Sequence, residues 1–517
     1  MSKTAKAALW IMIATMLSKV LGFGREVVLA NFYGTGQYAD VFLLTLNIPG
    51  LIIAVVGSAI ATTYIPLYFE AKEKKGDREA LKFTNNILNI CAVITVLIAI
   101  LGLIFTEQFV QVFAGGFEGE KFQLAVKFTK IMISGVLFLG VSKIFSSYLQ
   151  VNDNFVIPGL IGIPYNIIII AAIIISTKTN VLILAFGALV AMASQLLFQI
   201  PYAYKKSFKY KPYIKLKDDT IKDMIRLVLP MLVGVAIGQL NTFVDRALAT
   251  TLSDGKLSAL NYANKLNDFV MALFVTSVVT VIYPKLAKMS NSENNNGFVN
   301  TIVKSSNAIT LVVLPIAVGA IVLAEPIVKI LFQRGQFDAY STSITAMALR
   351  FYALGLLAMG MRDILYRVFY SMSDTKTPMI NGSIALIINI ILNLLLIKKL
   401  DYIGLALSTS VSSIITIILL FISLNKKVGY FGGDKIIKTG LKSLISSIIM
   451  GIVAFFVFNS VSGNIGTSMI KDILSVSSGV LAGAITYGIL IIILKVEELD
   501  LIFDMINKEK NKLIKRQ

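Results

Sequence analysis

The sequence contains no histidine and only one cysteine among its 517 residues. Histidine is a frequent general base and metal ligand, so its absence excludes histidine-based catalysis and Cys/His metal sites. The single cysteine, Cys91, has no partner for a disulfide within the chain. It lies in an apolar run, which is typical of a small buried or lipid-facing residue.

Charged residues are also scarce. They make up 15% of the chain, while hydrophobic residues make up 56%. A soluble protein of this length needs far more polar surface, whereas the exterior of a membrane protein is as apolar as its core. The composition therefore predicts an all-α polytopic membrane protein.

The net charge of +19 would indicate a nucleic-acid partner for a soluble protein. Here the lysines and arginines fall mainly in alternate loops, as orientation in a membrane requires. We therefore expect the protein to contact the lipid bilayer and not to bind nucleic acid.

Apolar runs of about twenty residues predict fourteen transmembrane helices. They are centred in residues 8–31, 38–69, 84–108, 124–150, 157–177, 182–204, 221–251, 257–287, 301–332, 340–371, 378–399, 403–425, 436–459 and 471–495.

The loops predict the orientation of these spans. Basic residues follow spans 2 and 6, namely Lys72, Lys74, Lys75, Arg78, Lys205, Lys206, Lys209, Lys211, Lys215 and Lys217. The opposite loops are short, neutral or acidic, as around Glu118 and Glu120. Basic loops stay in the cytoplasm, so both termini are expected there, which agrees with an even number of spans.

The two halves resemble one another at a nearly constant shift in numbering. Arg25, Gly34 and Asp40 correspond to Arg246, Gly255 and Asn261, and Pro158 corresponds to Pro378. An ordered series of this kind indicates a duplication, and six spans per copy give both copies the same orientation. We predict two six-helix lobes in parallel repeat, at residues 1–215 and 216–430, followed by two C-terminal helices and a basic tail at 431–517.

Charges within the predicted spans are concentrated in few helices. They are Lys19, Arg25 and Glu26 in span 1, Asp40 in span 2, Asp245 and Arg246 in span 7, and Lys265 and Asp268 in span 8. The repeat makes these helices equivalent, so their charges are expected to converge on a cavity between the lobes. Lys19 and Arg25 are six residues apart, which places them on neighbouring sides of one helix.

Two interpretations of these charges remain open. Arg25–Glu26, Asp245–Arg246 and Lys265–Asp268 are each spaced to form a structural ion pair. A charge at the bilayer centre costs about 3 kcal/mol on insertion scales and usually marks a substrate path. For Lys19 and Arg25 function is favoured, since only Glu26 is a local partner, and an excess of cations predicts an anionic ligand such as a phosphate.

Several motifs together resemble the MurJ (MviN) family of lipid II flippases. They are Lys19-Val-Leu-Gly-Phe-Gly-Arg25-Glu26, Asp40-Val-Phe, Asn152-Asp-Asn-Phe-Val-Ile-Pro158, Asn261-Tyr-Ala-Asn-Lys265, Arg334-Gly-Gln-Phe337 and Asp374-Thr-Lys-Thr-Pro378. The resemblance covers spans 1–12 in order.

The resemblance implies a transporter of the multidrug/oligosaccharidyl-lipid/polysaccharide exporter superfamily, not an enzyme. It implies movement of an undecaprenyl-pyrophosphate-linked precursor, lipid II, across the bacterial plasma membrane for peptidoglycan synthesis, cell-wall biogenesis and cell shape. Spans 13 and 14 would form a groove for the polyprenyl tail. The resemblance implies that Lys19, Arg25, Lys265 and Asp40 line the substrate cavity. We expect Glu26, Arg246 and Asp268, which lie among the same charges, to take part in substrate binding as well.

Two further implications concern span 2 and a metal ion. The family often has arginines in span 2, whereas this chain reads Ile48-Pro-Gly-Leu-Ile-Ile-Ala-Val-Val there, without a charge. The family's sodium site maps onto Asp245, Asn389, Asn393 and Thr409. One carboxylate makes only a weak site for a hard cation, and asparagines bonded to each other between helices are the slightly favoured alternative. No other cofactor is expected.

The alternative functions belong to different classes. A cation-coupled multidrug exporter, or an exporter of another lipid-linked polysaccharide, would share the fold, but a drug exporter should have an acidic, aromatic cavity. A lipid-modifying enzyme would usually need a carboxylate or histidine cluster, and only Asp218-Asp219 is available in a basic loop. No phosphate-binding nucleotide loop is present, so direct drive by ATP is not expected.

Overall fold

A computed structural model describes residues 3–290, 295–464 and 469–496, and every regular element in these ranges is a helix. The all-helical prediction is confirmed. Ten described helices are long and apolar enough to cross a membrane, or up to twelve if each of two bent pairs is one span. The predicted total of fourteen stays a prediction.

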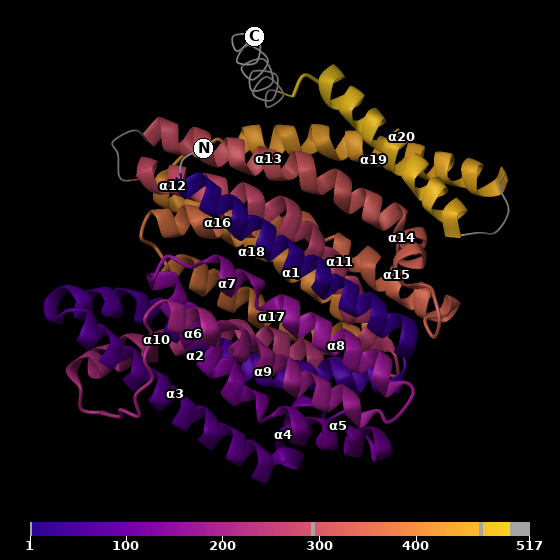
Figure 1. Cartoon of the computed structure of the whole chain (residues 1–517). Coiled ribbons are helices and arrows are strands. Elements are labelled where there is room, and N and C mark those ends of the chain that lie inside the picture. Colours follow the sequence, from indigo (N-terminus) through magenta and orange to yellow (C-terminus); the bar gives the residue numbers. More distant parts are fainter. Residues whose placement is uncertain (1–2, 291–294, 465–468, 497–517) are drawn as a thin grey trace, which may run out of the picture. The chain divides into compact units, whose positions relative to one another are not determined.

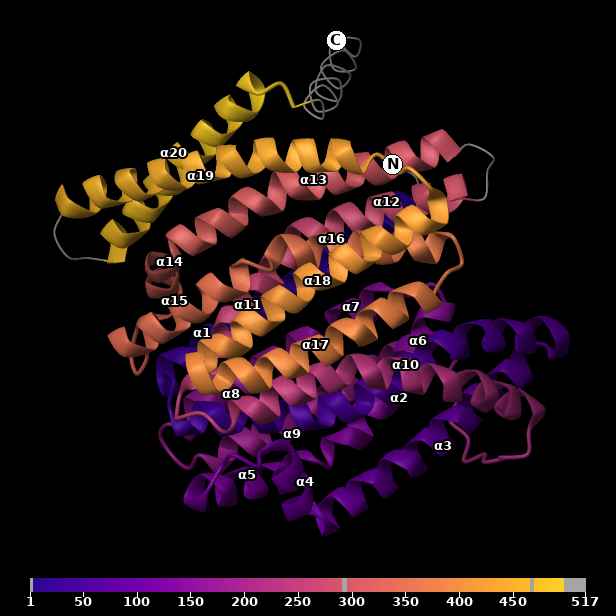
Figure 2. The same ribbon diagram turned by 180° about the vertical axis from the view of Figure 1, so that it is seen from behind.

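The described helices pack into two units (Figures 1 and 2). Unit 1 comprises the chain up to Ser258 together with Arg334–Ser341, and unit 2 the remainder. The helices of unit 1 are α1 (Lys3–Tyr33), α2 (Gln37–Lys75), α3 (Asp77–Ile104), α4 (Thr106–Phe113), α5 (Gly119–Met132), α6 (Gly135–Val151), α7 (Val156–Leu160), α8 (Gly162–Ser176), α9 (Leu182–Lys205) and α10 (Asp219–Ala249).

Unit 2 begins within the first turns of α11. Its elements are α11 (Lys256–Val270), the π-helical turn η1 (Met271–Val275), α12 (Thr276–Ser290), α13 (Asn295–Val322), α14 (Ala324–Phe332), α15 (Ala339–Ala353), α16 (Leu356–Ser371), α17 (Lys376–Leu400), α18 (Tyr402–Val428), α19 (Gly433–Asn464) and α20 (Met469–Ile493). Helices α19 and α20 lie side by side, and α19 packs on α13 (Figures 1 and 2).

Two bends and two turns recur at the numbering shift from which the sequence repeat is predicted. The pair α5/α6 bends by 42° and the pair α15/α16 by 44°, at corresponding places in the two halves. Gly34 ends α1 with φ 55° and Gly255 follows α10 with φ 88°, a left-handed backbone that glycine adopts without strain. These features support a duplication. Helix α10, which begins the second copy by sequence, nevertheless packs on α2 within unit 1.

The core of each unit lies between its helices. In unit 1 an aromatic cluster includes the stacked rings of Tyr64 and Phe83, whose centroids are 5.7 Å apart. In unit 2 aliphatic residues of α13, α16 and α18 fill the interior. Large apolar side chains such as Val93, Leu97 and Ile100 of α3 are exposed, as expected for a surface that faces lipid.

Candidate functional site

Arg25 lies in the C-terminal half of the long helix α1, where α8 packs against it. Its Nη2 atom is 2.5 Å from Glu26 Oε1, and Nη1 donates to Asn166 Oδ1 at 3.3 Å. The guanidinium also lies over the ring of Tyr165, 5.8 Å from its centroid. Glu26 is buried, so the Arg25–Glu26 ion pair is formed in the interior of unit 1.

Lys19 lies on the same helix with an exposed side chain. No described carboxylate lies within ion-pair distance of it. The two cations of span 1 therefore differ in their contacts. Arg25 contacts Glu26 and α8, whereas the side chain of Lys19 is exposed and can bind an anion.

Lys143 is a third cation at membrane depth, and the sequence-based search missed it. It lies in the middle of α6, with an exposed side chain whose Cγ would be 3.0 Å from a Cβ on Gly57 of α2. No ion pair with a carboxylate is recorded for it in the described part of the chain. Lys143, Ser146 and Gln150 share one face of α6 at helical spacing, while most of the other α6 residues are buried.

Ser146 donates to Gln199 Oε1 of α9 at 2.8 Å, so part of this face packs on a neighbouring helix. The exposed Lys143 fits contact with water better than contact with lipid. The sequence signal that could have found Lys143 is a lone lysine in the otherwise uncharged run 131–151. Its place beside the uncharged middle of α2, residues 41–69, bears on the departure from the family pattern in span 2.

Asp40 lies at the beginning of α2 and is 1% exposed. Its carboxylate accepts hydrogen bonds from the backbone N–H of Gly255, at 2.8 Å, and of Ser258, at 2.9 Å. Lys121 of α5 lies 2.9 Å from Asp40 and 2.7 Å from Asp254. A carboxylate at a helix N-terminus is stabilised by the helix dipole, so Asp40 fastens the start of α11 to α2.

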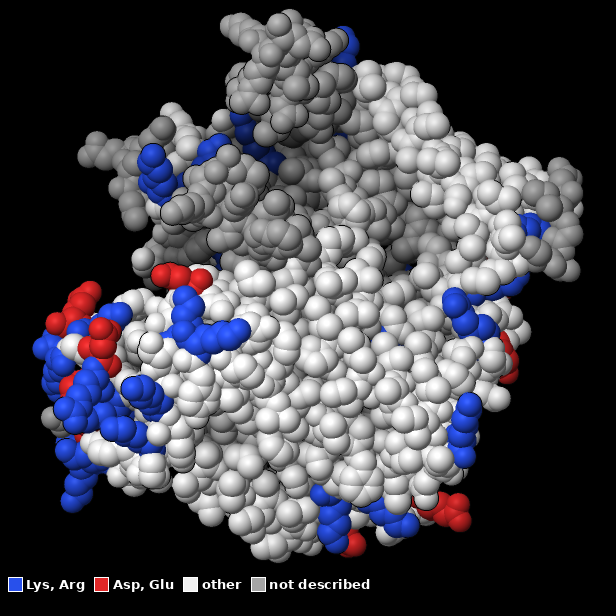
Figure 3. All heavy atoms as spheres, viewed as in Figure 1, with Lys and Arg blue, Asp and Glu red and all other residues white. Residues whose placement is uncertain are grey.

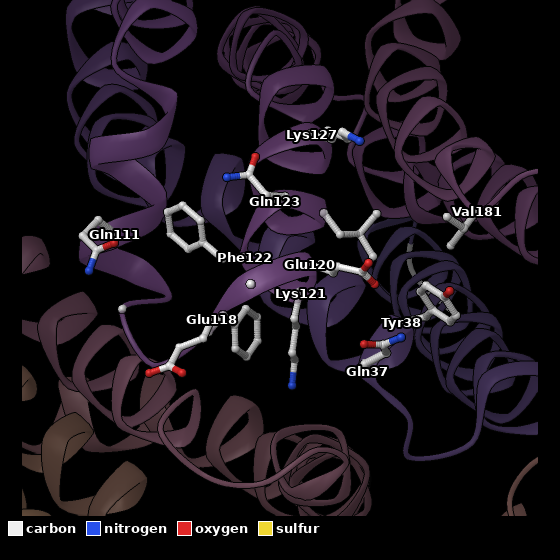
Figure 4. A pocket seen from close by; sticks show the side chains of 14 residues that line it. Gln37, Tyr38, Gln111, Glu118, Glu120, Lys121, Phe122, Gln123, Lys127 and Val181 are labelled. Carbon is white, nitrogen blue, oxygen red and sulfur yellow. The ribbon is translucent and has the colours of Figure 1, made fainter.

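Lys121 also lines an open pocket of about 920 Å³ at this end of unit 1. Figure 4 shows Glu118 and Lys121 reaching from the beginning of α5, and Gln37 and Tyr38 from the beginning of α2. Glu120, Gln123 and Lys127 complete a lining of amides and charges of both signs. Such a lining offers hydrogen bonds to a polar group.

The predicted charges of span 7 lie on α10. Arg246 donates to the backbone carbonyl of Leu43 on α2 at 3.5 Å, and Asp245 is half-buried beside it in sequence. Both residues belong to unit 1. Their predicted roles, Arg246 toward substrate and Asp245 toward sodium, stay predictions.

Lys265 and Asp268 lie on α11 in unit 2, 3.2 Å apart. Their side chains are 35% and 56% exposed. The i, i+3 pair that the sequence predicts is present. Exposed pairs contribute about 0–1 kcal/mol to stability, so this pair leaves Lys265 available to a stronger anion.

The predicted sodium ligands of spans 11 and 12 lie on α17 and α18 of unit 2. Asn393 Nδ2 donates to Asn389 Oδ1 at 3.0 Å, and Asn389 Nδ2 donates to Ser412 Oγ at 3.3 Å. Thr409 donates to Leu405 O of its own helix. This donor set fits the alternative in which the asparagines satisfy each other, and the sodium site stays a prediction.

An apolar pocket of about 530 Å³ lies within unit 2. Its walls come from α11, α13, α19 and α20, among other elements, and include Val270, Pro315, Gly319, Met450 and Gly483. Tyr487 of α20 donates to the carbonyl of Leu311 on α13 at 2.9 Å, which ties the C-terminal helix pair to this wall. The volume of this pocket is large enough to hold part of an apolar chain.

Long apolar helices with two similar bent pairs, cations at membrane depth and an apolar pocket define the class as a membrane transporter for an anionic amphiphile. The chain belongs to the family described as lipid II flippase MurJ, whose model matches residues 29–475.

The relatives agree with this family. The chain is 29% identical to a probable lipid II flippase MurJ of Vibrio cholerae over 80% of its own length and 82% of the relative's. It is also similar to the structure titled lipid II flippase MurJ, inward closed conformation, with 28% identity, a TM-score of 0.80 and coverage of 94% and 99%. An inward-facing multidrug MATE transporter shares the fold, with 13% identity, a TM-score of 0.70 and coverage of 82% and 98%.

Proposed function

We propose that this chain moves lipid II, the undecaprenyl-pyrophosphate-linked peptidoglycan precursor, from the inner to the outer leaflet of the bacterial plasma membrane by alternating access. The observation that carries the proposal is the excess of cations at membrane depth in unit 1. Lys19, Arg25 and Lys143 face only Glu26 as an acidic residue at that depth in α1 and α6. An anionic headgroup is the ligand that this arrangement favours.

The pyrophosphate would bind where these cations are accessible. Arg25 has a planar guanidinium that binds phosphate oxygens in a bidentate manner, and Lys19 and Lys143 contribute point charges. Since Glu26 already occupies one edge of Arg25, the ligand binds the remaining N–H groups or displaces Glu26. Lys143 takes the place of the span-2 arginines that this chain lacks, because its side chain lies over Gly57 of α2.

The remaining parts of the substrate have different requirements. The polyprenyl tail is apolar and would occupy the apolar pocket beside α19 and α20. The contacts of Asp40 fasten one end of unit 1, so they would break when that end opens and reform when it closes. Lys265 and Asp268, with Arg246, complete the substrate-binding set. Both termini would lie in the cytoplasm, and sodium is the proposed coupling ion.

The test uses a bacterial strain depleted of its own flippase. Full-length chain should restore growth and raise the fraction of lipid II accessible at the outer face of the membrane. The Arg25→Ala variant, checked for membrane insertion, should restore neither. Full complementation by this variant would contradict the proposal.

A cation-coupled multidrug exporter is the alternative, and the MATE-like fold is its only support. Drug efflux on expression, without a change in lipid II accessibility, would establish it.

A further inference from the structure

The loop between α9 and α10, residues 206–218, is irregular with a turn at each end, and from Phe208 to Lys217 it alternates basic with apolar residues. Lys209, Lys211, Lys215 and Lys217 occupy odd positions, while Phe208, Tyr210, Ile214 and Leu216 occupy even ones. Figure 3 shows lysine and arginine side chains, with acidic side chains among them, gathered at the end of unit 1 that carries this loop, beside a nearly uncharged wall. The positive-inside rule explains the charges but not the alternation.

Three asparagines of α3 hold the loop in this conformation. Asn85, Asn86 and Asn89 are buried, with exposed fractions of 1%, 1% and 7%. Asn85 accepts from the N–H of Lys211 and donates to the carbonyl of Lys209, and Asn86 makes the same two bonds with Lys215 alone. Asn89 donates to the carbonyls of Lys211 and Tyr213.

These asparagine side chains pair with backbone N–H and C=O groups of the loop, as the hydrogen bonds within a helix do for its own backbone. Non-helical backbone close to lipid must have its N–H and C=O groups paired, since each unpaired group costs several kcal/mol in hydrocarbon. The bonds from the asparagines are 2.8–3.1 Å long and pair with the backbone of Lys209, Lys211, Tyr213 and Lys215. Phe208, packed against Phe145 with centroids 5.1 Å apart, anchors the beginning of the loop.

The asparagines also fix where the loop lies along α3. Asn89 precedes Val93, the first of the strongly exposed apolar residues of α3, by four residues, or about 6 Å along the helix axis. The loop therefore covers α3 directly beside its exposed apolar surface, at the end of this span that is predicted to face the cytoplasm.

We propose that the α9–α10 loop is a docking surface for anionic lipid headgroups of the cytoplasmic leaflet. Ile214 and Leu216 are 55% and 61% exposed and would contact the acyl chains, while Tyr210, 51% exposed, donates its hydroxyl to Asn89 Oδ1 at 3.0 Å and is held against α3. The exposed lysines that alternate with them would bind the phosphates of the same lipids. An acidic soluble protein or a nucleic acid would bind the lysines, but would leave these apolar residues in water.

The probe is phosphatidylglycerol, with zwitterionic phosphatidylcholine for comparison. Full-length protein in an uncharged detergent is titrated with each lipid, and bound lipid is counted by native mass spectrometry. We expect preferential binding of phosphatidylglycerol that weakens with salt. A variant with Lys209→Gln, Lys211→Gln, Lys215→Gln and Lys217→Gln should bind phosphatidylglycerol at least about tenfold more weakly and lose the preference.

The matched control removes the same charge elsewhere. Lys178, Lys398 and Lys399 are exposed, Lys471 is half-buried, and all four lie in loops or helix ends predicted on the opposite side of the membrane. Their replacement by glutamine should leave the preference for phosphatidylglycerol intact. An equal loss in both variants would show an effect of net charge alone and would overturn the proposal, as would unchanged binding by the loop variant.

A second variant tests the apolar half of the surface. Ile214→Ser with Leu216→Ser should weaken the binding of both lipids, because it removes the contact with acyl chains and keeps all the lysines. If only the charge mattered, this variant would bind phosphatidylglycerol as the unchanged protein does, and the docking surface would be wrong. Size-exclusion elution of each variant reports whether it is folded.

Discussion

The two halves of the chain have similar bends and turns but differ in the carboxylates that accompany their cations. In α1 and α6 of the first half, Lys19, Arg25 and Lys143 are accompanied by one carboxylate, Glu26. In the second half, Asp245 adjoins Arg246 in sequence, and Lys265–Asp268 and Arg362–Asp363 are ion pairs. The proposed anion site therefore draws its charge mainly from the first half.

One pair of corresponding positions illustrates the difference. The shift in numbering that relates Pro158 to Pro378 relates Lys143 of α6 to Asp363 of α16. Asp363 lies 3.6 Å from Arg362, so the same helix position contributes to an ion pair in one copy and carries an unneutralised lysine in the other. The two halves therefore differ in the side-chain charge at this corresponding helix position.

The largest effect is expected from the Arg25–Glu26 pair. Arg25→Ala should abolish complementation, and it should also destabilise the protein, since leaving one member of a buried ion pair unpaired costs about 3–5 kcal/mol. The double variant Arg25→Gln with Glu26→Gln removes both charges and should restore thermal stability without restoring lipid II accessibility. Transport by the double variant would show that the pair is structural and that the first copy does not bind the anion through it.

The next effect is expected from Lys143. Lys143→Met keeps most of the side-chain volume and should lower the rate of lipid II flipping by about 10- to 100-fold, because one charged hydrogen bond contributes about 1.5–3 kcal/mol. Lys143→Arg should retain most of the rate. Since Lys143 lies over Gly57, Lys143→Ala with Gly57→Lys moves the cation to α2 and should recover part of the rate. A purely structural lysine would not be rescued by this relocation.

A smaller effect is expected from the exposed pair of the second copy. Lys265→Met should weaken transport by less than about tenfold, and Asp268→Asn should leave it nearly unchanged, because an exposed pair contributes about 0–1 kcal/mol. The two variants are compared by their rates of lipid II flipping at equal expression. If Lys265→Met were as damaging as Arg25→Ala, the anion site would draw equally on both copies.

The smallest effect concerns the turn that precedes α17. Burial would raise the pKa of Asp374, but hydrogen bonds from Lys427 and Thr377 outweigh it and hold the pKa at about 2. The carboxylate therefore stabilises the folded protein above the usual pKa of about 4, and this contribution is lost as the pH falls toward about 2.

The first copy provides the control for this turn. There Asn154 replaces the carboxylate and accepts from the N–H of Ile157 at 3.3 Å. Asp374→Asn should lower the midpoint of thermal unfolding at neutral pH and make that midpoint depend less on pH between pH 5 and 2. Asn154→Ala should lower the midpoint by the same amount at all pH values. The comparison fails if both variants show the same dependence on pH.

The sequence predicted the helical class and the family, because apolar run length and an ordered series of motifs survive divergence, while the duplication stays a prediction. It also predicted Arg25–Glu26 and Lys265–Asp268 as pairs, since their partners are near in sequence. It did not predict Lys143 or the asparagines that hold the α9–α10 loop. Their partners, Gly57 and Lys209–Lys215, are distant along the chain, and nothing in the local pattern identifies them.

The predicted domain boundary at residue 215 illustrates the same distinction. The boundary at residue 215 is predicted from the sequence repeat, whereas the division at Ser258 reflects which helices pack together. Helix α10 belongs to the second copy by sequence and packs in unit 1, so the two definitions differ by one helix.

The turns around Gly34 and Gly255 have a consequence for substitution at this end of unit 1. A Cβ on Gly34 would lie 2.3 Å from Gln336 O, and one on Gly255 would lie 2.1 Å from Thr35 O. Main chain thus approaches main chain at both turns, closer than a side chain at either glycine would allow. Any other residue at these two positions would push the paired segments apart, so the close packing here depends on the absence of a side chain.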